Sequence, residues 1–193
     1  MSAIDHARLE SAIVTILEAV GEDPSRPELA RTPERAAKML EELLGGIRID
    51  PREYLMDPLP EEQHDLVVVR DIGVHSLCEH HLVPMLGVVH IGYLPSGRIV
   101  GFDRLARLVD GYARRPQIQE RLTAQIADAI AEVLQPIGVA VVMDLEQFCM
   151  KIRGTRQTRS RVVTSAYRGA FSEDRALRAE FLSLVRPTTE ERV

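Results

Sequence analysis

The sequence predicts an α+β domain with an antiparallel sheet and paired helices, preceded by a helical N-terminal appendage. Three observations support this fold class. Apolar residues recur at helical spacing before residue 45, short β-branched runs begin after residue 65, and two helical segments separate the first strands from the last ones. Strands followed by paired helices and further strands are typical of α+β domains.

The N-terminal part is predicted to form two helices. Apolar residues over 9–20 have helical spacing, and Gly21 is a natural stop. The second helix should have Thr32 as its N-cap and Pro33 at its first position, and it should end at Gly45. These two helices are interpreted as an appendage to the main domain.

Proline and other turn formers concentrate between residues 47 and 64, and this segment is predicted to be a connector. The chain is therefore divided into an appendage with its connector, residues 1–64, and a main domain, residues 65–193.

The main domain should begin with strands at residues 66–69 and 86–94. The Pro-Ser-Gly turn at residues 95–97 then leads into residues 98–100, which is a hairpin signal. An open sheet of this kind has edges, and joining edges between subunits is one way to protect them.

Helices and strands alternate through the rest of the chain. Apolar spacing predicts helices over residues 105–112 and 118–134, the second one ended by proline and glycine. Further strands are expected at residues 139–144 and 161–165, and a closing helix at residues 173–185.

The composition argues against two classes of partner. Asp plus Glu number 29 and Lys plus Arg 24, so a net charge of -5 gives no general attraction to nucleic acid or an anionic membrane. No apolar run approaches the roughly twenty residues that cross a bilayer. The N-terminus lacks the basic start and apolar core of a signal peptide. Two cysteines without an export signal indicate a reducing cytoplasm, where thiols serve metal binding or catalysis more often than disulfides.

Cys78 and His81 form a Cys-x-x-His pair, and Cys149 is the second cysteine of the chain. A tight turn would bring the thiolate and the imidazole within reach of one ion. A third soft ligand from a distant strand would leave one position of a tetrahedral Zn²⁺ open for water, which is the catalytic pattern. Zinc-bound water loses a proton near neutral pH and becomes a nucleophile. The alternative is a disulfide or two inert buried thiols.

Other polar residues near these positions are candidates for chemistry, each with an ordinary alternative. His80 could transfer protons beside a metal, or it could be a surface histidine. Glu120 could accept two N–H groups from a guanine-type edge, or simply favour a helix N-terminus. Arginine forks suit phosphate oxygens, although most such arginines lie on solvated helix faces. The two arginine clusters are Arg104, Arg107, Arg114, Arg115 and Arg121, and Arg153, Arg156, Arg159 and Arg161.

Three ordered blocks resemble the GTP cyclohydrolase I family, whose members are zinc enzymes that turn GTP into dihydroneopterin triphosphate. The blocks read SLCEHHLVP at residues 76–84, RPQIQERLT at 115–123 and CMKIRG at 149–154. The resemblance extends from residue 31 to about residue 186. It implies the tunnelling fold (T-fold), in which subunit sheets join into a barrel. It also implies a homodecamer with active sites between subunits.

The resemblance further implies roles for individual residues. The implied zinc ligands are Cys78, His81 and Cys149. The implied proton-transfer residue is His80, the guanine contacts are Glu120 with Gln119 nearby, and the phosphate contacts are Arg107 and Arg153. The implied substrate is GTP, which is attacked at C8 of guanine so that the imidazole ring opens.

Two positions depart from the family pattern. Gln147 stands two residues before Cys149, where the family usually has a histidine, and glutamine cannot exchange a proton near pH 7. Losing a general acid or base costs on the order of 10² to 10⁴ in rate. Asp103 replaces a serine of the usual Gly-Leu-Ser-Lys, while Arg104 keeps the positive charge of the lysine. A charge about 4 Å from a phosphate could cost up to roughly 4 kcal/mol at an effective dielectric near 20.

These residues leave three functional hypotheses. In the first, a zinc-dependent cyclohydrolase opens the guanine ring, and Gln147 makes full conversion slow or stops it at the formamidopyrimidine. In the second, Asp103 shifts the same chemistry to a guanine compound with fewer phosphates. In the third, a catalytically silent paralogue binds a nucleotide or pterin, or modulates an active partner.

Overall fold

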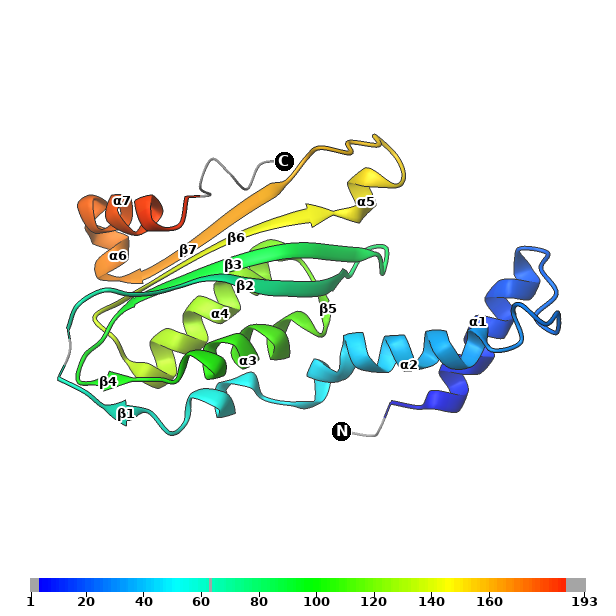
Figure 1. The fold of residues 1–193 in the computed structure, drawn as a ribbon, viewed down its shortest axis with the longest axis horizontal. Helices are drawn as coiled ribbons and strands as arrows, with labels where there is room; N and C mark the ends of the chain where they lie inside the picture. The colour runs from blue at the N-terminus through cyan, green and yellow to red at the C-terminus, as the bar shows by residue number, and fades with distance from the viewer. Residues whose placement is uncertain (1–3, 63, 187–193) are drawn as a thin grey trace.

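The computed structural model describes residues 4–62 and 64–186 of the 193-residue chain. A five-stranded sheet forms the centre of the molecule, with strand order β5-β2-β3-β6-β7 (Figure 1). All neighbouring strands are antiparallel except β5, which runs parallel to the end of β2. The strands are β2 (Val67–Cys78), β3 (Pro84–Leu94), β5 (Pro116–Gln117), β6 (Gly138–Gln147) and β7 (Val162–Gly169).

Two helices, α3 (Phe102–Ala113) and α4 (Gln119–Leu134), cover one face of the sheet (Figure 1). Alternate residues of the strands point into the core between sheet and helices, where Val89, Val141 and Leu122 are fully buried. The alternation is clearest in β6, where Val139 and Val141 belong to this core and Ala140 and Val142 belong to a second cluster on the opposite face. The α+β class with an antiparallel sheet and paired helices is thus confirmed.

The opposite face of the sheet is covered only at one end. There α6 (Ala170–Glu173) and α7 (Arg175–Leu184) pack Phe171 and Phe181 against a second, smaller apolar cluster. The two rings meet edge to face at 5.9 Å between centroids, a favourable aromatic geometry.

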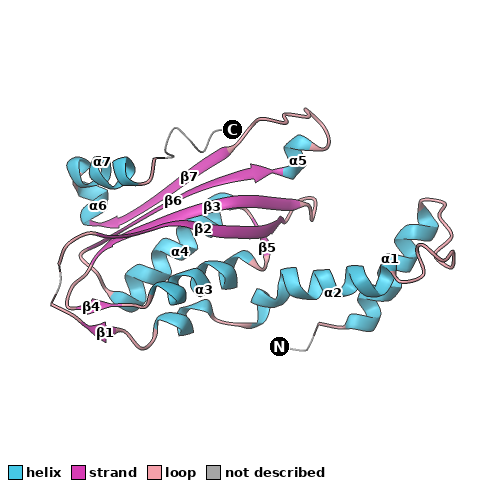
Figure 2. Cartoon of the chain, viewed as in Figure 1, coloured by secondary structure: helices cyan, strands magenta, loops and turns pink. Residues whose placement is uncertain are grey.

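The N-terminal helices α1 (His6–Ala19) and α2 (Thr32–Leu44) pack on each other and extend away from the sheet (Figure 2). The N-cap of α2 is Arg31, one residue before the predicted Thr32, and it makes no side-chain capping bond. His6 bridges the two helices through contacts of 3.0 Å to Glu10 and to Glu41. In the described part of the chain, no helix combines the length and apolar character needed to cross a bilayer.

The predicted connector contains regular structure. It holds the 3₁₀ helices η1 (Gly45–Arg48) and η2 (Pro51–Leu55), and strand β1 (Leu59–Pro60). Leu55 is fully buried against the core, so this segment is packed on the body rather than loosely attached.

The predicted hairpin after β3 is wrong. Strand β4 (Arg98–Ile99) pairs with β1 in a separate two-stranded sheet, with Leu59 opposite Ile99. The reason is that β3 already has β2 on one side and β6 on the other, so its backbone offers no free edge to the chain that follows it.

Candidate metal centre and active site

The turn between β2 and β3 places Cys78 and His81 beside each other. Cys78 ends β2, its N–H donates to the Val83 carbonyl at 2.9 Å, and the Leu82 N–H donates back to the Cys78 carbonyl at 2.8 Å. Leu82 has φ 52°, the left-handed conformation that closes this tight turn. The backbone therefore holds the thiol and the imidazole at one end of the sheet.

Cys149 reaches the same end from β6. The register pairs Gln147, the last residue of β6, with Met85 near the start of β3. The chain then enters a single helical turn, α5 (Phe148–Lys151), so Cys149 lies on a helix and not on a strand as predicted. Lys151 of this turn pairs with Glu146 of β6, which holds α5 against the sheet and lowers the pKa of the Glu146 carboxyl.

Cys78, His81 and Cys149 form one ligand group, in which the candidate donor atoms all lie within 4.8 Å of one another. Both cysteines are free thiols, so the disulfide alternative is wrong. Burial, together with the adjacent Cys78, raises the pKa of the Cys149 thiol. Two neighbouring thiolates disfavour each other without a cation, and a divalent ion removes that penalty. Two sulfurs and one imidazole nitrogen match the donor set of a catalytic zinc site, with one position left for water.

His80 lies beside this group and faces solvent. Its Nδ1 is 3.9 Å from the Cys78 sulfur, and its side chain is 63% exposed. The adjacent Glu79 carboxylate is 4.0 Å from His80 Nε2 and also pairs with Arg121 of α4.

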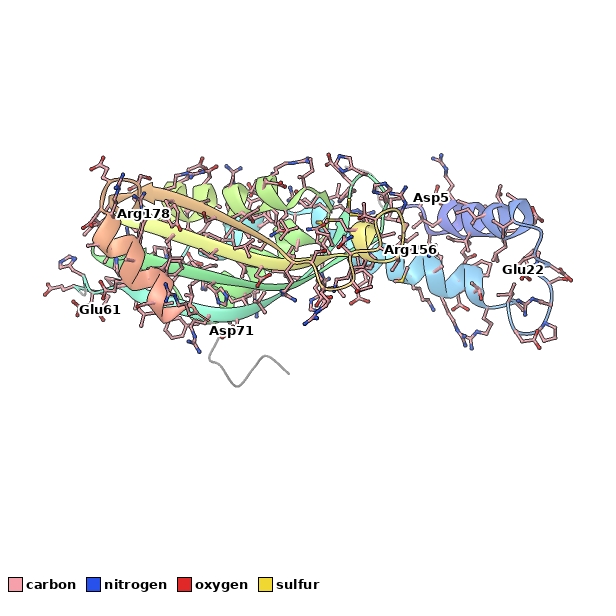
Figure 3. The ribbon with its side chains drawn as sticks, turned by 90° about the horizontal axis from the view of Figure 1, so that it is seen from above. Asp5, Glu22, Glu61, Asp71, Arg156 and Arg178 are labelled. Atoms are coloured by element: carbon pink, nitrogen blue, oxygen red, sulfur yellow. The ribbon has the colours of Figure 1, made fainter. Side chains whose placement is uncertain are left out.

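Arg153 contacts the ligand group, and Glu120 lies at the start of α4. The Arg153 guanidinium is 2.8 Å from Nε2 of His81. Glu120 is exposed in the first turn of α4, next to the buried Gln119. Arg156, in the exposed loop after α5, lies at this end of the sheet, whereas Arg178 of α7 lies at the other end (Figure 3).

Gln119 and Gln147 contact each other inside the protein. They are 2% and 9% exposed, and the Gln147 amide nitrogen donates to Gln119 Oε1 at 2.7 Å. Gln119 Nε2 lies within donating distance of the Met143 and Val162 carbonyls, at 3.2 and 2.8 Å. Both ends of the Gln119 amide therefore have partners within the chain.

Comparison with known proteins identifies the family. Residues 9–186 match the family GTP cyclohydrolase I. This chain belongs to the GTP cyclohydrolase I family. It is 49% identical over 187 residues to GTP cyclohydrolase 1 of Halalkalibacterium halodurans, covering 96% of this chain and 100% of that protein. It is 50% identical over 182 residues to GTP cyclohydrolase 1 of Desulforamulus reducens, covering 94% and 97%. The crystal structure of the archaeosine synthase QueF-Like in the apo form aligns with TM-score 0.46 and 19% identity, over 54% of this chain and 94% of that chain.

The three residues that the family resemblance assigns to the triphosphate region, Asp103, Arg104 and Arg107, lie far from the metal centre of the same chain. They occupy the N-terminal turns of α3, whereas Ala113 at its other end accepts a 2.7 Å hydrogen bond from Ser76, close to Cys78. The helix spans about 15 Å from Asp103 to Ala113 and about 9 Å from Arg107 to Ala113. One chain therefore does not bring the two groups together (Figure 1).

The N-terminus of α3 has its own polar contacts and its own cavity. Asp103 lies 3.4 Å from Arg107, and Arg104 donates to the Asp57 carbonyl at 3.3 Å. A cavity of about 400 Å³ next to this turn is mainly apolar, and its lining includes Val100. The other lining residues are Leu59, Glu61, Val67, Tyr93, Ile99, Gly101 and Phe102.

Sequence reasoning in this GTP cyclohydrolase I family member missed Glu79 and the contact between Gln119 and Gln147. Glu79 fixes the ligand turn to α4 and to β5, since its carboxylate pairs with Arg121 of α4 and its N–H donates to the carbonyl of Gln117 in β5 at 3.0 Å. An acidic residue inside the ligand block was the only local signal for it. No local signal links two glutamines from different elements, because their contact arises from the fold.

Proposed function

We propose that this chain opens the imidazole ring of GTP at a zinc site formed by Cys78, His81 and Cys149. Its class is that of its family, a hydrolase acting on cyclic amidines in pterin biosynthesis. The observation that carries the proposal is the convergence of two sulfurs and one imidazole within 4.8 Å at the end of the sheet. Bound there, zinc would supply Lewis-acid activation of water near neutral pH.

The chain's own residues would bind the substrate and move protons. The His80 imidazole, exposed beside the ligand group, would pass protons between the substrate and solvent. The Glu120 carboxylate would accept N–H groups of the guanine edge through its two oxygens. Arg153 would donate a fork of N–H groups to phosphate oxygens, leaving its contact with His81.

Gln147 would make conversion beyond ring opening slow, or stop it at the formamidopyrimidine. The amide binds through hydrogen bonds and exchanges no proton near pH 7, so we expect a loss on the order of 10² to 10⁴ in the later step. Mass spectrometry of the products from GTP and Zn²⁺ tests this directly. Accumulation of the formamidopyrimidine, relieved in Gln147→His, is the expected result, and rapid formation of dihydroneopterin triphosphate by the unaltered chain would refute it.

The complete site would form between copies of the chain, with Asp103, Arg104 and Arg107 supplied by a neighbour. Two features support this. Ala113, which contacts the strand that carries Cys78, lies about 15 Å along α3 from Asp103 and about 9 Å from Arg107. The sheet also has free edges, because among the described residues β7 pairs on one side only and β2 uses only its last two residues to pair with β5. Joining such edges would close a barrel, and we propose the homodecamer of the family.

Subunit complementation tests the shared site. Cys149→Ser lacks a metal ligand and Arg107→Ala lacks a phosphate contact, so each variant alone should be impaired. Chains of the two variants, dissociated together and reassembled, should regain activity, because some sites then combine an intact metal centre with an intact α3. Zinc content, measured by competition with a chromophoric chelator, should fall only for Cys149→Ser. Mixed assemblies with no regained activity would place the whole site in one chain.

A guanine compound with fewer phosphates is the second candidate substrate. The observation that favours it is the pairing of Asp103 with Arg107, which engages an arginine otherwise free for a triphosphate. Turnover of GTP, GDP, GMP and guanosine under identical conditions separates the two, and strong preference for GTP would exclude this candidate. Binding without turnover of any of them would indicate a silent paralogue.

A further inference from the structure

The buried contact between Gln119 and Gln147 fixes the direction of both amides. Gln119 Nε2 lies 3.2 Å from the Met143 carbonyl and 2.8 Å from the Val162 carbonyl. Carbonyl oxygens only accept hydrogen bonds, so the end of Gln119 that faces them has to be its NH₂ group.

A threonine pair supports the same orientation. Thr123 donates to the Gln119 main-chain carbonyl at 2.8 Å, so its contact of 2.6 Å with Thr164 has to be donated by Thr164. The Thr164 hydroxyl has a single proton, and it donates that proton to Thr123. Toward the Gln119 side chain, 3.2 Å away, Thr164 can therefore only accept.

The orientation of Gln147 follows from that of Gln119. With its nitrogen turned to the strands, Gln119 presents Oε1 to residue 147 and needs a donor there. Gln147 supplies it through Nε2 at 2.7 Å, which turns its own carbonyl oxygen away from Gln119. Within the described residues this oxygen has no protein partner and is not among the fully buried, unpaired atoms.

Gln147 lies at the end of the sheet that carries the ligand group. Gln147 shares a rung of the sheet with Met85, and the residue opposite Met85 on β2 is Ser76, two residues before Cys78. Strand alternation places Ser76 and Cys78 on the same face, and Cys149 follows Gln147 by two residues.

We propose that Gln119 is a positioning residue that holds the Gln147 amide with its nitrogen inward, so that residue 147 presents a carbonyl acceptor toward the end of the sheet where Cys78, His81 and Cys149 lie. This proposal depends on the proposed function only because it takes GTP as the bound molecule. Gln119 then acts through Gln147, and the guanine edge is left to Glu120 and to backbone groups.

The side-chain carbonyl oxygen of Gln147 can bind only groups of the ligand that donate a hydrogen bond. The imidazole ring of GTP carries no N–H, because N7 has a lone pair and N9 bears the ribose. Ring opening by one water adds its oxygen to C8, breaks the C8–N9 bond and leaves one proton on each of N7 and N9. The Gln147 oxygen can therefore accept a hydrogen bond from water or from the ring-opened compound, and not from the imidazole ring of GTP.

A double-mutant cycle tests the coupling without metal or substrate. Gln119→Met, Gln147→Leu and the double variant are compared by thermal unfolding of the zinc-free full chain. Removing either partner removes the same hydrogen bond, so the two losses should be non-additive. Gln125→Met is the matched control on α4, since it removes another amide contact of 2.9 Å, from Gln117. It should be additive with Gln147→Leu.

Turnover then separates positioning from direct ligand contact. Gln119→Met should lower kcat for GTP ring opening about 10- to 100-fold with KM unchanged, because it misplaces residue 147. In the Gln147→Leu background it should have no further effect on kcat. A raised KM for GTP in either background would show that Gln119 touches the ligand, and additive unfolding losses would show no coupling; either result overturns the proposal.

Two substitutions at residue 147 cover the case in which Gln119→Met does not fold. Gln147→His keeps an N–H for Gln119 Oε1, and Gln147→Glu keeps an acceptor while losing the donor. The zinc-free His variant should unfold at nearly the same temperature as the unaltered chain, and the Glu variant at a clearly lower one. Equal unfolding temperatures for the two would overturn the proposal. If the unaltered chain does not open GTP, the unfolding experiments still stand, and only the proposed function fails.

Discussion

Replacing Asp103 by serine tests whether the N-terminus of α3 binds a triphosphate. The Asp103 and Arg107 side chains lie 3.4 Å apart and are 68% and 64% exposed. Exposed ion pairs contribute at most about 1 kcal/mol, so the substitution should leave folding nearly unchanged. In water, a carboxylate about 4 Å from a phosphate charge opposes binding by about 1 kcal/mol, well below the value expected at lower dielectric. Its removal should therefore lower KM for GTP about fivefold.

The assay is steady-state kinetics with GTP and GMP at low and high salt. The fall in KM for Asp103→Ser should be larger for GTP than for GMP, and it should shrink as salt screens the charges. Asp110→Ser is the matched control, because Asp110 makes an equivalent pair with Arg114 at 3.0 Å on the same helix. An unchanged KM for GTP, or equal effects on both nucleotides, would refute the assignment of this turn to the triphosphate.

Gly92→Ala should lower the unfolding free energy by about 1–3 kcal/mol, because the added methyl group would lie 2.6 Å from the buried Phe181 ring. Gly45→Ala, with no atom within 4 Å, should be neutral or slightly stabilising in the same denaturation experiment; equal losses would contradict the packing argument. Burial lowers the pKa of His90 below its ordinary 6.5, so the unfolded chain binds more protons and stability falls as pH drops below about 6.5. Unfolding of His90→Gln between about pH 7 and 5 should show a weaker pH dependence, and an unchanged slope would exclude His90 as its source.

The metal group was predictable because few residue types bind zinc. A Cys-x-x-His pair and a second cysteine include both thiols of the chain, so their convergence follows once the chain is interpreted as a metalloenzyme. The helices were predictable for a similar reason, since the spacing of apolar residues in 118–134 matches α4 almost to the residue.

Strand β2 was predicted far too short, at residues 66–69 against Val67–Cys78. A register shift between Val69 and Ile72 interrupts the alternation of burial, and Asp71 has φ 59° at this irregularity. A bulge of this kind changes which side chains face the core, so a period-2 pattern does not continue through it.

The position of β4 and the place of the phosphate-binding candidates depend on the whole fold. The turn at residues 95–97 has the composition of a hairpin, but β3 has no free edge, and β4 pairs with β1 instead. The resemblance implies Asp103, Arg104 and Arg107 as members of one site without stating which copy supplies them. The order of residues along the chain does not show that α3 keeps these three residues away from the metal centre of the same chain.

The ion pair between Lys151 and Glu146 has a consequence for handling the protein. Lys151 shares its helical turn with Cys149, so one sulfur donor of the metal group is held in place partly by a charge contact. The Lys151 side chain is only 16% exposed, and partly buried pairs are screened by salt much less than exposed ones. Moderate salt in purification buffers should therefore leave this turn, and with it the Cys149 sulfur, in place.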